Sequence, residues 1–153
     1  MPRFESVRRV DHSAAEMFAL VADVERYPEF LPLCEALVVR ERRQRGTTSL
    51  LIADMTVGYR NIHETFTSRV FLQPDDGAID VAYLDGPFSR LDNRWRFRDA
   101  GPGSSEISFF IDYEFRNRML GALMGTMFDR AFHAFSEAFA ERADRIYRSA
   151  PST

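Results

Sequence analysis

Residues 35–115 alternate between apolar and polar side chains with a period of two, and short groups of turn residues interrupt the alternation. The clearest stretch runs from Ile107 to Phe115, where every second residue is apolar. The pattern predicts strands at residues 36–43, 47–57, 61–72, 78–84, 88–98 and 105–115. Residues 3–10 are predicted to form a first strand before them. Parallel strands need crossovers of about a dozen residues or more. These short breaks therefore predict one antiparallel sheet of seven strands.

Two short helices are expected after the first strand. Ser13 and Glu16 have the S-x-x-E spacing of a capping box, which predicts the start of the first helix. Asp23 is expected to cap the second helix, because a short polar side chain at this position satisfies free backbone N–H groups. Pro28 is expected to end that helix at about Tyr27, because the residue before a proline is disfavoured in helical geometry.

A long helix is predicted after the last strand, over residues 118–148, with Asn117 as its cap. Its apolar residues recur at helical spacing and form a wide stripe that would pack on the sheet. The first half, 119–128, carries no charge. We expect this uncharged half to be buried, bound to a ligand or in contact with a membrane.

This order of elements predicts an α+β fold in which a curved sheet packs around the long C-terminal helix. One helix covers a seven-stranded sheet incompletely, so an internal apolar cavity is expected between them. The segment 27–34, Tyr-Pro-Glu-Phe-Leu-Pro-Leu-Cys, is mostly apolar, and its two prolines exclude a continuous helix or central strand. It either plugs the core or forms the mouth of the cavity. Residues 1–148 are interpreted as a single domain and 149–153 as a frayed tail.

Several apolar residues are candidates for the wall of this cavity, although an ordinary core position is the simpler interpretation of any single one. The candidates are Tyr27, Phe30 and Leu31 in the proline segment, Met55, Phe66, Leu91, Trp95, Phe109, Ile111 and Tyr113 in the strands, and Met124, Met127, Phe128 and Phe135 in the long helix. Binding pockets are mainly apolar with a few polar groups. Tyr27, Asn93 and Tyr113 are the candidates for those groups.

The charge of the chain argues against DNA as a partner. All 20 basic residues are arginine, and the net charge is −3, which creates no general attraction to nucleic acid or anionic membranes. A local exception precedes Gly46, where a basic turn is either simply solvated or in contact with phosphate or lipid headgroups. Its basic residues are Arg40, Arg42, Arg43 and Arg45.

The chain has one cysteine, Cys34, which excludes an internal disulfide. Its first residues lack the apolar run of a signal peptide, and no stretch reaches the length needed to cross a bilayer. A cytoplasmic location of the bacterial type is expected, with transient contact at the periphery of the inner membrane left open.

No pattern of catalytic or metal-binding residues is evident. The histidines His12, His63 and His133 do not have the spacing of metal ligands, and no phosphate-binding glycine loop or nucleophile elbow appears. His133 is interpreted as a buried histidine with satisfied hydrogen bonds. Four strand carboxylates are expected to point outward: Asp54, Asp80, Asp92 and Asp112. No metal, no catalytic residue and no enzymatic activity are predicted, although one buried acid or tyrosine would be enough for catalysis.

Three segments resemble one known family. Residues 27–34 resemble its Y-P-x-F-L-P-x-C motif, and residues 86–97 resemble its G-P-F-x-x-L-x-N-x-W-x-F strand. Residues 112–121 and the Phe-rich helix that follows resemble its C-terminal third. Over roughly residues 2–147 the chain resembles the coenzyme Q-binding protein Coq10 group of START-like domains, which includes ribosome association toxins. Leu33 departs from the tryptophan that family members often carry there.

The resemblance implies a helix-grip fold that binds a polyprenyl quinone or similar lipid, with ubiquinone as bound ligand rather than catalytic cofactor. It implies a carrier that supports respiratory electron transport or quinone biosynthesis, gated by the proline segment and residues 119–128. The alternative is a ribosome-binding toxin that contacts the large subunit through residues 40–45 and blocks subunit association. A third alternative, an aromatase/cyclase-type enzyme, is disfavoured because no acid–base pair is evident. Quinone head group, tail length and oligomeric state stay open.

Overall fold

The computed structural model describes residues 3–59 and 61–147. Its elements are β1 (Arg3–Val10), α1 (Ala14–Ala22), the 3₁₀ helix η1 (Val24–Glu29), β2 (Cys34–Arg45), β3 (Thr48–Tyr59), β4 (Ile62–Gln73), the 3₁₀ helix η2 (Pro74–Asp76), β5 (Ala78–Asp85), β6 (Phe88–Asp99), β7 (Ser105–Phe115) and α2 (Arg118–Tyr147). The predicted strands are confirmed, with ends that agree within two residues. The predicted tail 149–153 and helix end at 148 lie outside the described residues.

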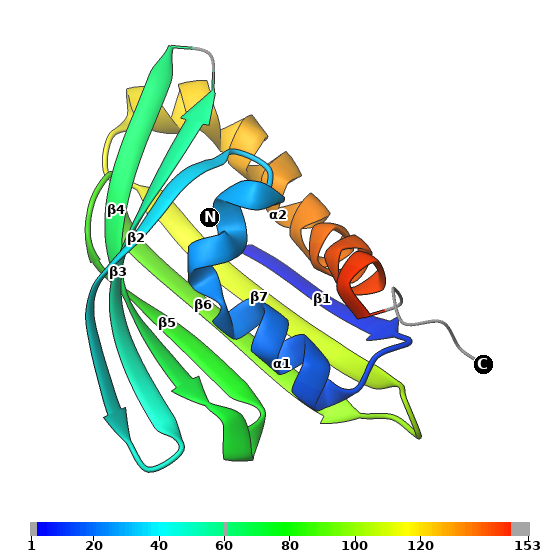
Figure 1. Cartoon of the computed structure of the whole chain (residues 1–153). Helices are drawn as coiled ribbons and strands as arrows, with labels where there is room; N and C mark the ends of the chain where they lie inside the picture. The colour runs from blue at the N-terminus through cyan, green and yellow to red at the C-terminus, as the bar shows by residue number, and fades with distance from the viewer. Residues whose placement is uncertain (1–2, 60, 148–153) are drawn as a thin grey trace.

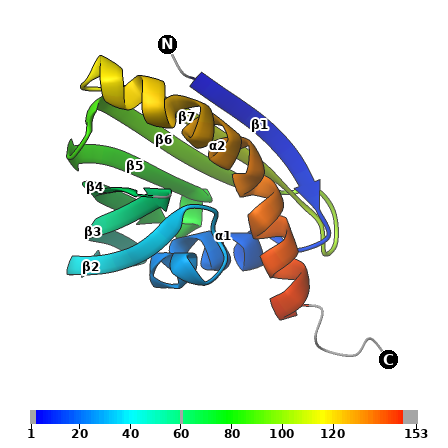
Figure 2. The same ribbon diagram turned by 90° about the horizontal axis from the view of Figure 1, so that it is seen from above.

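The strands form one antiparallel sheet with the order β1-β7-β6-β5-β4-β3-β2. The sheet curves around α2, and α1 and η1 lie on the same concave side (Figures 1 and 2). The pairing of β2 with β3 shifts register between Cys34 and Ala36 and again between Val39 and Glu41. Such irregularities bend a strand, and they occur where β2 lies beside η1. The predicted helix-grip architecture is confirmed.

Side-chain caps fix the starts of the two α-helices. The predicted capping box is present in α1: the Ser13 hydroxyl accepts a hydrogen bond from the Glu16 N–H, and the Glu16 carboxylate accepts one from the Ser13 N–H. At α2, the Asn117 side-chain oxygen accepts a hydrogen bond from the Met119 N–H at 2.7 Å. Both caps satisfy backbone donors that have no partner inside the helix.

The prediction for the second short helix was wrong in two respects. Asp23 does stand at the N-cap position of η1, but its carboxylate forms no capping hydrogen bond and instead lies 3.7 Å from the Arg26 guanidinium. Pro28 lies inside η1 rather than after it. The proline is tolerated because the turn closes beyond it, where the Phe30 N–H donates to the Tyr27 carbonyl.

One face of α2 packs into the concave side of the sheet. Its buried residues are Met124, Phe128, Ala131, Phe132, Phe139, Ala140 and Ala143. The uncharged segment 119–128 divides by face: Met124 and Phe128 are buried, whereas Met119 and Leu123 are 70% and 59% exposed. Within the described parts of the chain, no helix is both long enough and apolar enough to cross a membrane.

Candidate functional site

An apolar cavity lies between the concave face of the sheet, α2 and the proline segment. Its volume is about 100 Å³. The period-two pattern of β3, β4, β6 and β7 directs alternate side chains into this space. From α2, Phe128, Phe132, Phe135 and Phe139 reach the wall at helical spacing. The predicted internal cavity is therefore present.

Ten of the fourteen predicted site residues lie on the cavity wall. They are Tyr27, Leu31, Met55, Phe66, Leu91, Trp95, Phe109, Ile111, Phe128 and Phe135. They come from η1, the loop after it, four strands and α2. The structure thus brings together segments that are separated by up to about a hundred residues in the sequence.

Four predicted site residues lie elsewhere: Phe30, Tyr113, Met124 and Met127. Tyr113 is 2% exposed and is enclosed by other rings, with the Phe132 ring centre 5.0 Å away. Met124 is 1% exposed in the packed core. Met127, three residues further along α2, is half-buried. Phe30 packs outside the cavity against Phe139. Tyr113, Met124 and Met127 were predicted from spacing along an element and Phe30 from its place in the proline segment, and neither shows where the core closes.

The prediction missed other wall residues. Leu33, Ser68, Phe132 and Phe139 all line the cavity. Ser68 lies between Phe66 and Val70 on the same face of β4, so counting by two along that strand would have found it. Phe132 and Phe139 follow Phe128 at four and eleven residues along α2, which is the same helical face.

The proline segment is held in place by hydrogen bonds at both ends. The Tyr27 hydroxyl donates to the Val21 carbonyl, and burial raises the pKa of this phenol. Leu33 has a φ of 68°, a left-handed conformation that is rare for a bulky residue, and its carbonyl accepts from the Gly58 N–H at 3.0 Å. Burial raises the pKa of Cys34 to about 11, so this thiol is protonated at neutral pH.

The polar side chains on the wall are few. Asn93 donates from Nδ2 to the Phe110 carbonyl at 2.9 Å, and its Oδ1 accepts from the Trp95 indole N–H at 3.2 Å. The Ser68 hydroxyl is buried and has no hydrogen-bond partner among the described residues. Tyr113, the third polar candidate, lies off the wall, and burial raises its pKa to about 12. The described wall includes no Asp, Glu, His, Lys or Arg side chain.

The prediction for His133 was wrong, and a different histidine is buried. His133 was predicted to be buried, but it is an exposed residue of α2, with Nδ1 2.7 Å from the Asp129 carbonyl oxygen and its ring centre 4.0 Å from that of Phe4. The buried histidine is His12, which is 4% exposed and has Nε2 2.7 Å from Asp144 Oδ1. Neither lines the cavity, and no cluster of His, Cys, Asp and Glu in the described part of the chain could hold a metal ion.

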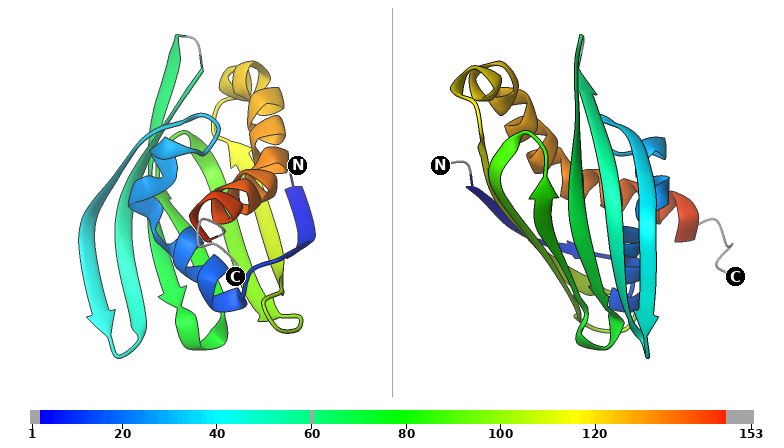
Figure 3. Two further views of the ribbon diagram at one scale, coloured as in Figure 1. Left: turned by 45° about the vertical axis from the view of Figure 1, so that its right-hand side comes forward. Right: turned by 90° about the vertical axis from the view of Figure 1, so that its left-hand side faces the viewer.

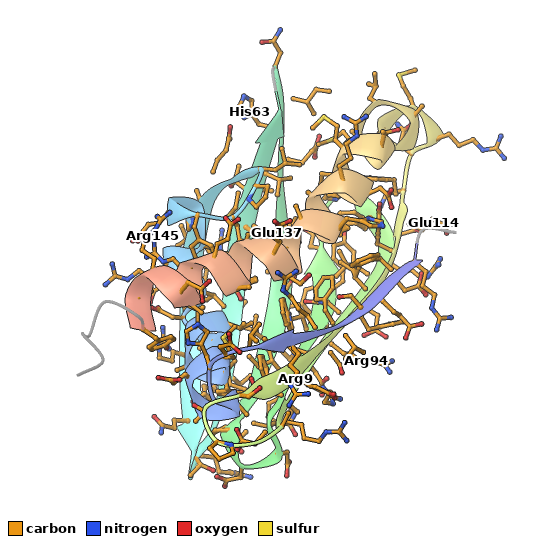
Figure 4. The ribbon with its side chains drawn as sticks, turned by 90° about the vertical axis from the view of Figure 1, so that its right-hand side faces the viewer. Arg9, His63, Arg94, Glu114, Glu137 and Arg145 are labelled. Carbon is orange, nitrogen blue, oxygen red and sulfur yellow. The ribbon has the colours of Figure 1, made fainter. Side chains whose placement is uncertain are left out.

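The charged groups lie on the outside of the molecule. Figure 4 shows Arg94, Glu114 and Glu137 pointing away from the space between sheet and helix. Asp54 was expected to point outward; it does lie on the convex face, but it is 9% exposed because Arg40 and Thr67 cover it. Burial opposes its ionisation, yet hydrogen bonds from Thr67 and Arg40 lower its pKa overall.

The basic turn before Gly46 is largely paired with acidic residues. Arg40 pairs with Asp54, Arg42 with Glu25 at 3.1 Å, and Arg43 with Glu41 at 2.8 Å. The carboxylates reduce the positive field that the sequence alone would indicate.

Comparisons with known proteins identify the family. A family model described as "Polyketide cyclase / dehydrase and lipid transport" matches residues 10–140. The chain belongs to this family. It is 33% identical over 136 residues to the Pseudomonas aeruginosa protein named ribosome association toxin RatA, covering 89% of this chain and 91% of that protein. The Drosophila melanogaster protein named mitochondrial coenzyme Q-binding protein COQ10 is 28% identical over 145 residues, covering 93% of this chain and 57% of that protein.

Solved structures agree with this fold. An 18 kDa protein from Caulobacter crescentus is 32% identical, with a TM-score of 0.78, and the match covers 96% of this chain and 99% of that one. The Zhui aromatase/cyclase from Streptomyces has a TM-score of 0.79 with 99% of each chain covered. Its identity is only 20%, so this likeness shows the fold alone. The resemblance found in the three sequence motifs is confirmed at the level of the family and of its START-like fold.

Proposed function

We propose that this family member binds an uncharged lipophile, a polyprenyl quinone such as ubiquinone, and acts as its carrier. The observation that carries the proposal is the apolar, uncharged wall of the cavity. Pockets for such ligands are mainly apolar with a few placed polar groups. The family's description includes lipid transport, and one relative is named as coenzyme Q-binding; both support this choice of ligand.

The size of the cavity suggests how a quinone would fit. Pockets that enclose a whole drug-sized ligand have volumes of roughly 300–1,000 Å³, whereas this cavity measures about 100 Å³. A quinone ring would therefore occupy the cavity, and the isoprenoid tail would leave between the proline segment and α2. Leu33 and Phe135 are half-buried wall residues on these two elements. Their displacement would open a path for the tail.

The test is organic extraction of the natively purified protein followed by mass spectrometry. We expect stoichiometric quinone in the wild type and in Glu141→Gln, which changes an exposed residue on α2. Phe128→Asp places a carboxylate in the wall, where an ion without a partner is strongly disfavoured, and should abolish quinone retention. Circular dichroism must show that each variant is folded. Equal quinone content in all three folded proteins would contradict the proposal.

The carrier would load and unload at an anionic membrane surface. Met119 and Leu123 are exposed apolar residues one turn apart at the start of α2, and Arg116 and Arg118 precede them. The start of α2 and the β3–β4 hairpin lie at the same end of the molecule (Figures 1 and 3). Apolar side chains beside arginines are typical of segments that bind the interface of anionic bilayers.

A second candidate function is ribosome association. It is favoured by the name of the Pseudomonas relative, which is among those with more than 30% identity. The contact would use the basic turn, in which Arg45 has no ion pair among the described residues. Because Arg42 and Arg43 are already paired with Glu25 and Glu41, ribosomal phosphates would have to displace these carboxylates.

This second function has its own test. Cosedimentation with large ribosomal subunits should decrease steeply with salt, as expected for contacts with phosphates. It should be lost when Arg42, Arg43 and Arg45 are changed together to glutamate. Binding that is insensitive to salt and to these changes would remove this mechanism without affecting the carrier proposal.

A further inference from the structure

Among the described residues of the cavity wall, one polar side-chain group makes no hydrogen bond. Ser68 lies on β4 between Phe66 and Val70, which both line the cavity, and it is itself a wall residue. It is 5% exposed, and its Oγ has no hydrogen-bond partner in the described structure. The pairing of β4 with β5 shifts register between Thr67 and Ser68. Such irregularities often re-aim a side chain beside a functional site.

The other polar groups of the wall are engaged with the protein. The Tyr27 hydroxyl donates to the Val21 carbonyl. The Asn93 amide donates to the Phe110 carbonyl, and its oxygen accepts from the Trp95 indole. The Ser68 hydroxyl is therefore the polar side-chain group on the described wall that makes no hydrogen bond to the protein, so a ligand can bind it without competing with an existing contact.

A buried hydroxyl without a partner destabilises the folded protein. Alanine at position 68 would not have this disadvantage, and Ala53, directly opposite on β3, shows that a small apolar residue is accommodated in this part of the sheet. Two further buried hydroxyls, Ser6 and Ser105, also have no partner among the described residues, but neither lines the cavity. An acceptor oxygen on a bound ligand would satisfy Ser68 and no other orphaned hydroxyl.

We infer that Ser68 donates the hydrogen bond that orients the ligand, and that the ligand is an uncharged lipophile with a carbonyl or ether oxygen turned toward β4. This inference rests on the proposed function. A carboxylate or phosphate ligand is disfavoured because the described wall supplies no positive charge to compensate its loss of hydration. A pure hydrocarbon is also disfavoured because it leaves the Ser68 hydroxyl unpaired. A quinone ring, which is neutral and carries such oxygens, meets both conditions.

The experiment measures the affinity of two probes in detergent solution. Decylubiquinone has carbonyl and methoxy oxygens, whereas dodecylbenzene has a ring and tail without oxygen. The chain has one tryptophan, Trp95, which lies on the cavity wall, so its fluorescence reports decylubiquinone directly and dodecylbenzene by competition. The variants are Ser68→Ala and, as matched control, Ser105→Ala, which removes an orphaned hydroxyl that is 0% exposed and away from the cavity.

We expect Ser68→Ala to weaken decylubiquinone binding by about three- to tenfold, which is the usual contribution of one hydrogen bond to affinity. Dodecylbenzene binding should be unchanged. Neither variant should lower the melting temperature of the empty protein. Ser105→Ala should bind both probes as the wild type does. An equal change for both probes, or no change for either, would overturn the role of Ser68 while the carrier function stands. Failure of the wild type to bind either probe would overturn the carrier function as well.

Discussion

Arg142 of α2 and Glu29 at the end of η1 form an ion pair, with Nη2 and Oε1 2.6 Å apart. The Arg142 side chain is 15% exposed, and its guanidinium lies 5.0 Å from the centre of the Phe30 ring. Phe30 and Tyr27 both pack edge-on against Phe139 of the same helix, at 5.2 and 5.4 Å between ring centres. These contacts fix the proline segment on α2. In the proposed carrier, contacts that stabilise the fold would therefore also restrain the exit of a ligand.

The Glu29–Arg142 pair predicts a pH dependence of stability. Hydrogen bonds from Arg142 and Arg26 lower the pKa of Glu29 below its ordinary value of 4.5. A carboxyl with a lowered pKa in the folded state stabilises the protein above its unfolded pKa, and this contribution is lost as the pH falls through the folded pKa. Arg142→Met should thus reduce the free energy of unfolding at neutral pH, and the difference from wild type should shrink as the pH falls below 4.5.

Urea unfolding at a series of pH values measures this difference. Arg145→Met is the control, because Arg145 is exposed in the last turn of α2 and should give no such pH dependence. Arg142→Met should also release bound quinone faster than the wild type. A stability difference that is constant down to the acid end of the series would show that the arginine acts only through its packing on Phe30.

Filling the cavity should remove binding without removing the fold. Ala131 is 7% exposed and lies on the wall, so Ala131→Leu would place three more carbon atoms in the cavity. Overpacking a core costs about 1–3 kcal/mol, which leaves a folded protein. Quinone affinity should fall by about tenfold or more, which corresponds to a loss of at least ~1.4 kcal/mol.

Isothermal titration with decylubiquinone in detergent measures the effect of this substitution. Ala122→Leu is the matched control, because it adds the same atoms to an exposed position of the same helix. Equal affinities of the two variants would place the ligand outside this cavity.

The sequence was sufficient for the sheet and for the inward face of its strands. Alternation by two, with turn residues at the breaks, located each strand, and it placed residues such as Met55 and Trp95 on the concave face. The wide apolar stripe located α2 for the same reason. These features are local, because the periodicity of a helix or strand can be recognised from neighbouring residues alone.

The closure of the core was not predictable from such patterns. Tyr113 and Ile111 lie on the same face of β7, yet only Ile111 lines the cavity, because rings from β6 and α2 close over Tyr113. The pairing of His12 with Asp144 joins residues 132 positions apart, so no local pattern indicated which histidine is buried. Such features depend on the curvature of the sheet and on contacts between distant elements.

The start of α2 should bind anionic bilayers. No carboxylate occurs between Glu114 and Asp129, so Arg116 and Arg118 face lipid phosphates without local competition. Each arginine near an anionic surface contributes about 1 kcal/mol, so changing both to glutamine should weaken binding to phosphatidylglycerol vesicles roughly 30-fold. Met119→Asp with Leu123→Asp should also reduce binding, whereas Val38→Asp, at a position that is 57% exposed on β2, should not. Vesicle flotation measures each case, and equal binding to neutral phosphatidylcholine vesicles would contradict the role of the arginines.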